Sequence, residues 1–239
     1  MRRMNNAMKW VLAAAFMGTL VVAGCGDAKK SDDAETEKAG PPKVDGVLDD
    51  AFWKTVEPMS VAKLNFGEDV PSKTRVFVAH DGKTLYLAAE CSDDPEALKN
   101  LVADTTDHDT SGIWNDDCIE FFIDPTGKRE SYYQFIVNSK NVTWDVFHTE
   151  PGTSWDAEWE PKYEIKTVVG EKSWIVEMAV PIAAFDRTTE HATTWVFNAS
   201  RTRVAADETT FWKPTMEDGS HVPKSFGVLE NMPAKTAAP

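Results

Sequence analysis

The segment WNDDCIEFFID, residues 114–124, has the pattern of a strand that follows an aromatic turn. Its second half is rich in β-branched and aromatic side chains, a composition typical of strands. Because successive side chains alternate between the two faces of a strand, the segment divides into two sets. The set expected in the core is Ile119, Phe121 and Ile123. The set expected on the opposite face is Asp116, Cys118, Glu120 and Phe122.

The same two-residue period recurs along most of the chain. Further strands are expected at residues 75–80, 84–89, 132–138, 142–148, 163–168, 174–180 and 195–203. Asp81 and Gly82 separate the first two of these strands, and this pair is typical of a tight hairpin turn. Many short strands without alternating helices predict an all-β fold, an antiparallel β-sandwich of the jelly-roll or immunoglobulin-like type.

Helical signals are limited to two short segments. The first is residues 48–56, which follow Asp45 and Gly46. The second is residues 94–99, where Asp94 suits the cap position and Pro95 suits the first helical position. The sequence therefore predicts one or two short helices beside the sheets.

The start of the chain has the layout of a bacterial lipoprotein signal peptide, expected at residues 1–24. Its basic residues are Arg2, Arg3 and Lys9. They precede an apolar run at residues 10–20 that is too short to span a bilayer. The run leads into VAGC, residues 22–25, which resembles the lipobox of bacterial lipoproteins and predicts a lipid anchor on Cys25. Gly26 after this cysteine favours an outer-membrane location in the cell envelope.

Composition divides the rest of the chain into three parts. Residues 25–42 are rich in Lys, Asp, Glu and Ala, and are expected to form a disordered linker because they can bury little apolar surface. Residues 43–231 have the length of one domain with a substantial core. Residues 232–239 form an Ala- and Pro-containing tail that is expected to be disordered.

The charge of the chain excludes one class of partner. The 239 residues include 25 Lys and Arg against 39 Asp and Glu. Cleavage after residue 24 removes three of the basic residues and no acidic one, which leaves 22 − 39 = −17. Nucleic-acid binding needs a basic surface, so it is not expected. Contact with a membrane is expected through the lipid anchor alone.

Seven phrases spread over the domain occur in an order found in one family. They are VDGVLDDAFW (44–53), LYL (85–87), WNDDCIEFFID (114–124), YQFIVN (133–138), WIVEMAVP (174–181), FNASR (197–201) and SFGVL (225–229). In this order the chain resembles the family 9 carbohydrate-binding modules. The resemblance covers residues 43–230 and implies a β-sandwich with a shallow sugar site, often with structural calcium.

The resemblance also implies roles for individual residues. Members of the family hold a terminal sugar between two tryptophans, and Trp114 matches the first of them. The second is missing, because SHVP stands at residues 220–223. His221 and Trp212 are the candidates to complete the clamp. The arginine-type contact expected on the strand after Gln134 falls on Ile136.

Hydrogen bonding to sugar hydroxyls is assigned to three polar residues. Glu120 matches a hydrogen-bonding acid of the family, and Gln134 and Arg201 are expected to add further bonds. For Arg201, a salt-bridged position at the rim is the alternative reading. Trp155 and Trp159 lie in a long loop and are expected to form a further sugar platform.

Calcium, the one cofactor expected, has a candidate loop at residues 104–109. Asp104, Asp107 and Asp109 supply oxygen ligands of the kind that calcium binds. A solvated acidic loop is the alternative reading. The histidines at 80, 108, 148, 191 and 221 show no zinc spacing.

No motif for catalysis or for a disulfide bond stands out. Glycoside hydrolysis needs two carboxyl groups roughly 5 to 9.5 Å apart. Asp116 and Glu120 share a strand face but lie about 13 Å apart at the rise of a strand. Cys91 is expected in the core while Cys118 faces away, so no bond between them is expected. The chain is therefore not expected to be an enzyme.

These observations predict a non-catalytic, lipid-anchored protein of the bacterial cell envelope that binds a polysaccharide or a glycan end and supports carbohydrate catabolism. Two other classes stay open. One is a haem-binding or redox β-sandwich of the envelope. The other is a protein–protein interaction module that has kept the fold and lost sugar binding.

Overall fold

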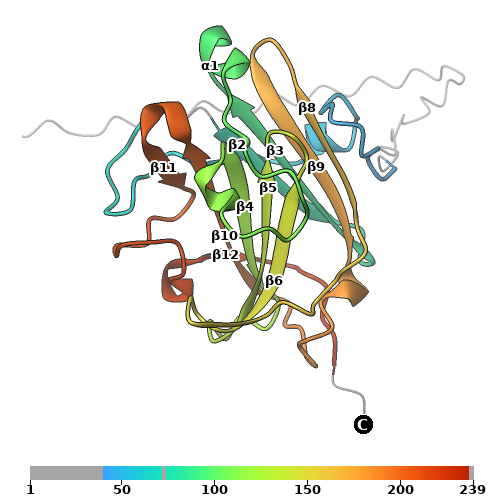
Figure 1. The fold of residues 1–239 in the computed structure, drawn as a ribbon. Helices are drawn as coiled ribbons and strands as arrows, with labels where there is room; N and C mark the ends of the chain where they lie inside the picture. The colour runs from blue at the N-terminus through green and yellow to red at the C-terminus, as the bar shows by residue number, and fades with distance from the viewer. Residues whose placement is uncertain (1–39, 72–73, 237–239) are drawn as a thin grey trace, which may run out of the picture. The chain divides into compact units, whose positions relative to one another are not determined.

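The described residues, 40–71 and 74–236, form two antiparallel sheets in this computed structural model (Figure 1). This arrangement confirms the predicted all-β sandwich. The predicted signal peptide and Cys25 lie outside the described residues. Within the described part, no helix is both long enough and apolar enough to cross a membrane.

The first sheet has five strands in the order β1-β2-β3-β9-β8. Their bounds are β1 (Met59–Ser60), β2 (Thr74–His80), β3 (Thr84–Ser92), β9 (Ser173–Pro181) and β8 (Glu164–Val169). The predicted hairpin joins β2 to β3, and Gly82 adopts a φ of 92°, which favours glycine. The Asp81 carboxylate accepts hydrogen bonds from the backbone N–H groups of Lys83 and Thr84, which holds the turn.

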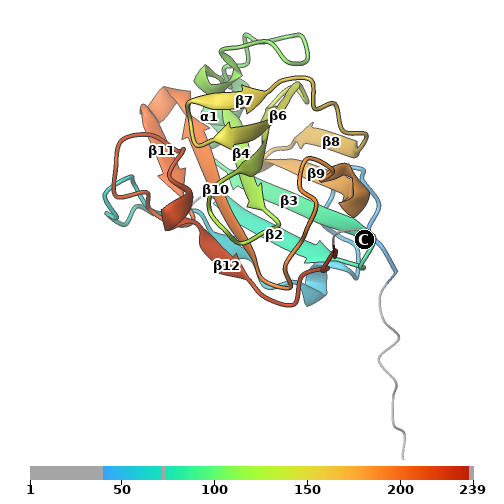
Figure 2. The same ribbon diagram turned by 90° about the horizontal axis from the view of Figure 1, so that it is seen from below.

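The second sheet has seven strands, and six of them follow the order β11-β10-β4-β5-β6-β7. Their bounds are β11 (Glu208–Phe211), β10 (Trp195–Arg203), β4 (Cys118–Asp124), β5 (Tyr132–Asn138), β6 (Thr143–Glu150) and β7 (Ser154–Asp156). The seventh strand, β12 (Gly227–Leu229), pairs with the start of β10. Figure 2 shows β12 beside β10 on one side of this sheet and β7 beside β6 on another.

All eight predicted strands are present, and those at 118–124, 132–138 and 195–203 have the predicted bounds. The sequence did not predict β1, β7, β11 and β12, since two to four residues are too few to establish a period. Of the predicted helices, α1 (Pro95–Lys99) is present with Asp94 at its N-cap position. The short 3₁₀ helices are η1 (Trp53–Thr55), η2 (Ile113–Asn115), η3 (Ile182–Ala184), η4 (Val204–Ala206) and η5 (Pro223–Ser225).

The predicted helix at residues 48–56 was wrong, because the structure forms only η1 there. The preceding backbone is held by a carboxylate instead of by helical hydrogen bonds. Asp45, Gly46 and Val47 all donate their N–H groups to Oε2 of Glu177 on β9, at 3.1, 2.6 and 3.1 Å. Trp53 donates its indole N–H to the other oxygen of Glu177 at 2.7 Å.

The main core lies between the two sheets and contains the predicted apolar face of β4. Ile119, Phe121 and Ile123 are fully buried in it, beside side chains of β2, β3 and β9. The opposite face of β4 is buried too. Cys118 packs there with Ile113 of η2, and other segments cover the remainder of the strand.

The two cysteines that the structure describes are both free and buried, which agrees with the prediction of no disulfide. Cys91 belongs to the main core. Cys118 lies on the other face of its sheet. The sheet therefore separates the two thiols.

The prediction of a disordered tail from residue 232 was wrong for the part that the structure describes. Met232 is buried in the main core. His191 and Lys235 form an antiparallel bridge, in which each backbone N–H donates to the carbonyl of the other. The described part of the final segment packs because the side chain of Met232 is buried in the main core.

Candidate functional site

A pocket of about 370 Å³ lies on the face of the second sheet that is turned away from the first sheet. We call this face the outer face. The aromatic residues of the lining are Trp114, Trp144, Trp155 and His221, and the polar ones include Glu120, Gln134 and His148. Five residues predicted from the sequence therefore meet in one place, namely Trp114, Glu120, Gln134, Trp155 and His221.

The floor of the pocket is a chain of hydrogen bonds across neighbouring strands. Glu120 on β4 accepts bonds from Gln134 Nε2 on β5 at 2.6 Å and from Ser200 Oγ on β10 at 3.0 Å. Gln134 in turn bonds through Oε1 to His148 Nε2 on β6 at 2.7 Å. Because an amide oxygen can only accept, Nε2 of His148 must carry the proton. These two hydrogen bonds fix the orientation of the Gln134 amide.

Burial shifts the protonation of both ends of this chain. It raises the pKa of Glu120 to about 7, and the bonds from Ser200 and Gln134 only partly offset that rise. Burial and the neighbouring His221 lower the pKa of His148 to about 3. The imidazole of His148 is therefore neutral at physiological pH, consistent with its role as a fixed donor.

One end of the pocket is an aromatic wall made by Trp114 and Trp144. The two rings meet edge to face at 5.8 Å, and 43% of Trp114 is exposed. Trp114 lies on η2, between Gly112, whose φ is 102°, and the β4 strand. The neighbouring Ile113 is fully buried and anchors this turn. Trp114 thus has an exposed ring on a fixed backbone.

The carboxylates next to Trp114 serve the loop and do not face the pocket. Asp116 accepts bonds from the backbone N–H groups of Asp104 and Thr105, and from the Asn138 side chain. Asp117 accepts a bond from the N–H of Val102 at 2.8 Å. Both residues are buried, so they hold the loop that positions Trp114.

The other end of the pocket carries His221 and Trp155. Trp155 is 51% exposed and its ring lies 6.3 Å from that of His148. Nδ1 of His221 and the hydroxyl group of Tyr132 form a hydrogen bond of 2.6 Å. A side chain at Gly152 would lie 2.9 Å from Cβ of His221, so only glycine fits beside it. The polar floor lies between two aromatic ends.

Three predicted sugar-contacting residues lie elsewhere. Arg201 is fully buried on the opposite face of β10, where it bonds Asp93, because the face alternates from Ser200 to Arg201. Trp212 lies against Gly227 and Phe197. The structure therefore corrects both assignments. The third residue, Trp159, lies in the main core.

Trp159 is buried in the main core and cannot form a sugar platform. Its ring lies 4.7 Å from Tyr133, and its N–H donates to the carbonyl of Ala184. Trp155, predicted together with it, does reach the pocket. The two tryptophans are four residues apart in one loop, and no periodic pattern in the sequence separates their environments.

The three aspartates predicted to bind calcium are not brought together as ligands. Asp104 is tied through its backbone to Asp116, and Asp107 accepts a bond from the neighbouring Thr106. Asp109 lies beside His108, with its Oδ2 3.3 Å from Nε2 of the imidazole. Calcium binding by this loop stays a prediction.

The described lining of the pocket does not contain the pair of carboxylates that glycoside hydrolysis needs. Among the lining residues that the structure describes, Glu120 is the one carboxylate. The reaction requires two carboxyl groups on either side of the scissile bond. The pocket can therefore stack and hydrogen-bond a ligand, but its lining lacks the pair for hydrolysis.

Comparison with known families gives a match over nearly all of the domain. The family described as carbohydrate family 9 binding domain-like matches residues 44–230. The chain belongs to this family. The family is one of non-catalytic carbohydrate-binding domains, so residues 44–230 form a carbohydrate-binding domain and not a catalytic one.

Relatives and solved structures agree with this assignment. Endo-1,4-beta-xylanase A of Thermotoga neapolitana is 34% identical over 114 residues, which cover 44% of this chain and 10% of the xylanase. The chain thus spans about a tenth of that relative's length.

Two solved structures of a family 9 module from Caldicellulosiruptor kristjanssonii share the fold. The complex with cellotriose has a TM-score of 0.55 and 18% identity, and the match covers 84% of this chain and 92% of that one. The complex with glucose has a TM-score of 0.56 and 18% identity, over 81% and 92%. At this level of identity the likeness shows the fold alone.

Proposed function

We propose that the pocket on the outer face binds a polysaccharide or the end of a glycan chain. The observation that carries this proposal is a polar floor, Glu120 and Gln134, between aromatic ends at Trp114 and Trp155. Sugar rings have apolar faces that stack on exposed indoles, and hydroxyl groups at their edges that need hydrogen-bond partners. Exposed tryptophans beside a buried, oriented carboxylate and amide supply both.

The ligand is a neutral glycan. Glu120 lies in the floor, and the whole chain has a formal charge of −14. Burial raises the pKa of Glu120 to about 7, so a sugar carboxylate would meet a like charge on the ionised fraction of Glu120 in a partly desolvated pocket, which is unfavourable. The structural neighbours are complexes with the neutral sugars cellotriose and glucose.

Trp114→Ala tests this function directly. Isothermal titration of the wild-type protein with glucose, cellotriose and xylotriose should show binding of at least one of them. Loss of the stacking surface should weaken that binding about tenfold, equivalent to about 1.4 kcal/mol. Phe66→Ala is the matched control, because Phe66 is 55% exposed and is not part of the pocket lining. Equal affinity of the Trp114 variant and the wild type would refute the site.

We also propose that the domain acts at the bacterial cell envelope through a lipid on Cys25 and supports carbohydrate catabolism there. The basis is the basic start, the short apolar run and VAGC at residues 22–25. Cys25→Ser should move the protein from the membrane to the soluble fraction and abolish incorporation of labelled palmitate. Unchanged membrane attachment of the variant would contradict the anchor.

A further inference from the structure

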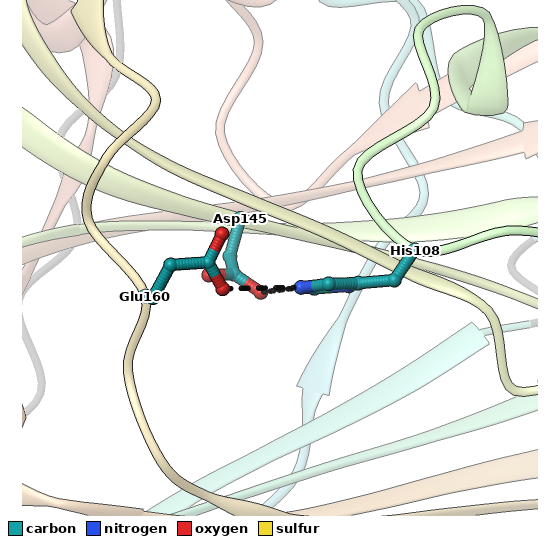
Figure 3. Close-up of side chains that lie close together, drawn as sticks. All are labelled: His108, Asp145 and Glu160. Carbon is teal, nitrogen blue, oxygen red and sulfur yellow. Dashed lines mark ion pairs between the residues drawn. The ribbon is translucent and has the colours of Figure 1, made fainter.

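Four side chains from three segments gather near the start of β6, apart from the sugar pocket. Figure 3 shows three of them, His108, Asp145 and Glu160, with their polar atoms turned toward one another. Potential ligand atoms of these three all lie within 4.8 Å of one another. Asp109, next to His108 in the chain, lies beside this group, with its Oδ2 3.3 Å from Nε2 of His108.

The imidazole of His108 is oriented as in metal-binding histidines. Its Nδ1 lies 3.0 Å from the carbonyl oxygen of Thr143. A carbonyl oxygen can only accept, so Nδ1 carries a proton. In the neutral ring Nε2 then has the free lone pair, and it faces the carboxylates. Ligating histidines usually donate their other N–H to a carbonyl or carboxylate in this way.

Asp145 supplies a second and independent indication. It is only 1% exposed, and its Oδ1 accepts a 2.7 Å bond from the hydroxyl of Tyr163. Its Oδ2 is also buried and has no hydrogen-bond partner among the described residues. A buried carboxylate oxygen without a partner is unfavourable, and here other carboxylates stand nearby. A cation bound by the Asp145 carboxylate would offset this cost and relieve the repulsion.

The distances around His108 suit a shared ion better than direct ion pairs. Nε2 lies 3.3 Å from Asp109 Oδ2, 3.9 Å from Asp145 Oδ1 and 3.5 Å from Glu160 Oε2. Charge-assisted hydrogen bonds are shorter, at about 2.7–2.9 Å. Ligand atoms placed tetrahedrally at about 2.0–2.1 Å from a zinc ion are about 3.4 Å apart. The observed separations are close to that spacing.

We propose that His108, Asp109, Asp145 and Glu160 form a binding site for one divalent transition-metal ion, with Zn²⁺ as the best fit. One imidazole nitrogen with carboxylates favours such an ion over calcium, which takes oxygen ligands. The ion joins β6 to two loops, the loop that leads to η2 and the loop after β7. Glu160 and His108 are partly exposed, so the ion enters from solvent.

Titration calorimetry of EDTA-treated protein with Zn²⁺ alone, and separately with Ca²⁺ alone, tests the site. Wild type should bind one Zn²⁺ more tightly than Ca²⁺, and Zn²⁺ should raise its melting temperature. Glu160→Gln and His108→Ala should each weaken Zn²⁺ binding at least tenfold. Asp107→Asn is the matched control in the same loop and should bind as the wild type does.

Two outcomes would overturn the proposal. In the first, Zn²⁺ binds with the same affinity to wild type, Glu160→Gln and His108→Ala. In the second, Ca²⁺ binds more tightly than Zn²⁺ and His108→Ala leaves that affinity unchanged. Circular dichroism of each variant confirms its folding, and the exposed position of Glu160 makes its substitution compatible with the fold.

Discussion

At the scale of single residues, Glu120 is buried and also lines the pocket. Its carboxyl group is buried within the sheet and receives hydrogen bonds from Ser200 and Gln134. These bonds hold both oxygens in place for a ligand hydroxyl. Burial makes the ionised form costly, and this cost is what raises its pKa to about 7.

The raised pKa of Glu120 predicts a pH dependence of stability. Below its ordinary value of 4.5 the carboxyl group is protonated in both the folded and the unfolded chain. Between 4.5 and about 7 the unfolded chain releases the proton while the folded chain keeps it. The free energy of unfolding therefore falls as pH rises through this range, by up to about 3 kcal/mol.

Urea unfolding of wild type and Glu120→Gln at pH 4.5 and pH 8 measures this effect. Asp145 also has its pKa raised to about 7, so the difference between the two proteins isolates Glu120. The variant should gain up to about 3 kcal/mol relative to wild type as pH rises. Glu57→Gln, at an exposed position, should follow the wild type. Parallel pH profiles for Glu120→Gln and wild type would contradict the prediction.

At the scale of elements, Glu177 on β9 holds the N-terminal segment against the first sheet. Its two oxygens accept bonds from the N–H groups of residues 45–47 and from the Trp53 indole. Gly46 is tightly packed as well, because a Cβ there would lie 2.4 Å from a methyl of Val168. Residues 45–47 belong to no helix or strand, so the Glu177 carboxylate accepts the backbone hydrogen bonds that regular secondary structure would otherwise supply.

Glu177→Ala should therefore destabilise the protein strongly. The change leaves several buried donors without an acceptor, for a loss of about 3–5 kcal/mol in the free energy of unfolding. Glu164→Ala, on the edge strand β8 and exposed, should cost less than about 0.5 kcal/mol. Chemical denaturation of the two variants measures these losses. Similar losses of unfolding free energy in both variants would contradict the role of Glu177 in holding the N-terminal segment.

Around Trp114 too, buried carboxylates hold the backbone of a segment that has no regular secondary structure. Asp116 and Asp117 bind backbone N–H groups of the loop, while Trp114 itself is left exposed. The sequence predicts the aromatic and the carboxylates as neighbours along the chain. It does not distinguish carboxylates that hold a loop from one that faces a ligand, since both are acidic residues in a turn.

At the scale of the whole molecule, the sandwich protects its two internal thiols. Burial raises the pKa of Cys91 to about 11, and it also raises the pKa of Cys118. Both side chains are fully buried. Cys91 lies in the main core between the sheets, and Cys118 lies on the outer face of the second sheet. Their reaction with a thiol reagent requires exposure through unfolding.

Thiol labelling of the Cys25→Ser variant at pH 8 tests this protection. Both thiols should be unreactive in the folded protein, and their labelling should appear in urea together with the loss of the circular dichroism signal. The intact mass should equal that of the fully reduced chain. Rapid labelling of either thiol without denaturant, or a mass two hydrogens lower, would contradict the structure.

Much of the fold could be predicted because the strands are long enough to show their period. The pattern at residues 118–124 placed Ile119, Phe121 and Ile123 in the core, as observed. The short edge strands and the segment at 48–56 were missed, because their conformation depends on pairing and on Glu177, far away in sequence. The end at Met232 was missed because one buried side chain carries no periodic signal.

Sequence alone determined the sheet class and the apolar face of β4, since alternation is a local property. The resemblance to the family made Trp114, Glu120, Gln134 and His221 candidates for sugar contact. Only the tertiary structure decided which side chains share a pocket. It brought Trp155 to that pocket, turned Arg201 into the opposite face, and joined His108 to Asp145 and Glu160. Such groupings depend on strand order and loop paths, which are set by packing between residues distant in the chain.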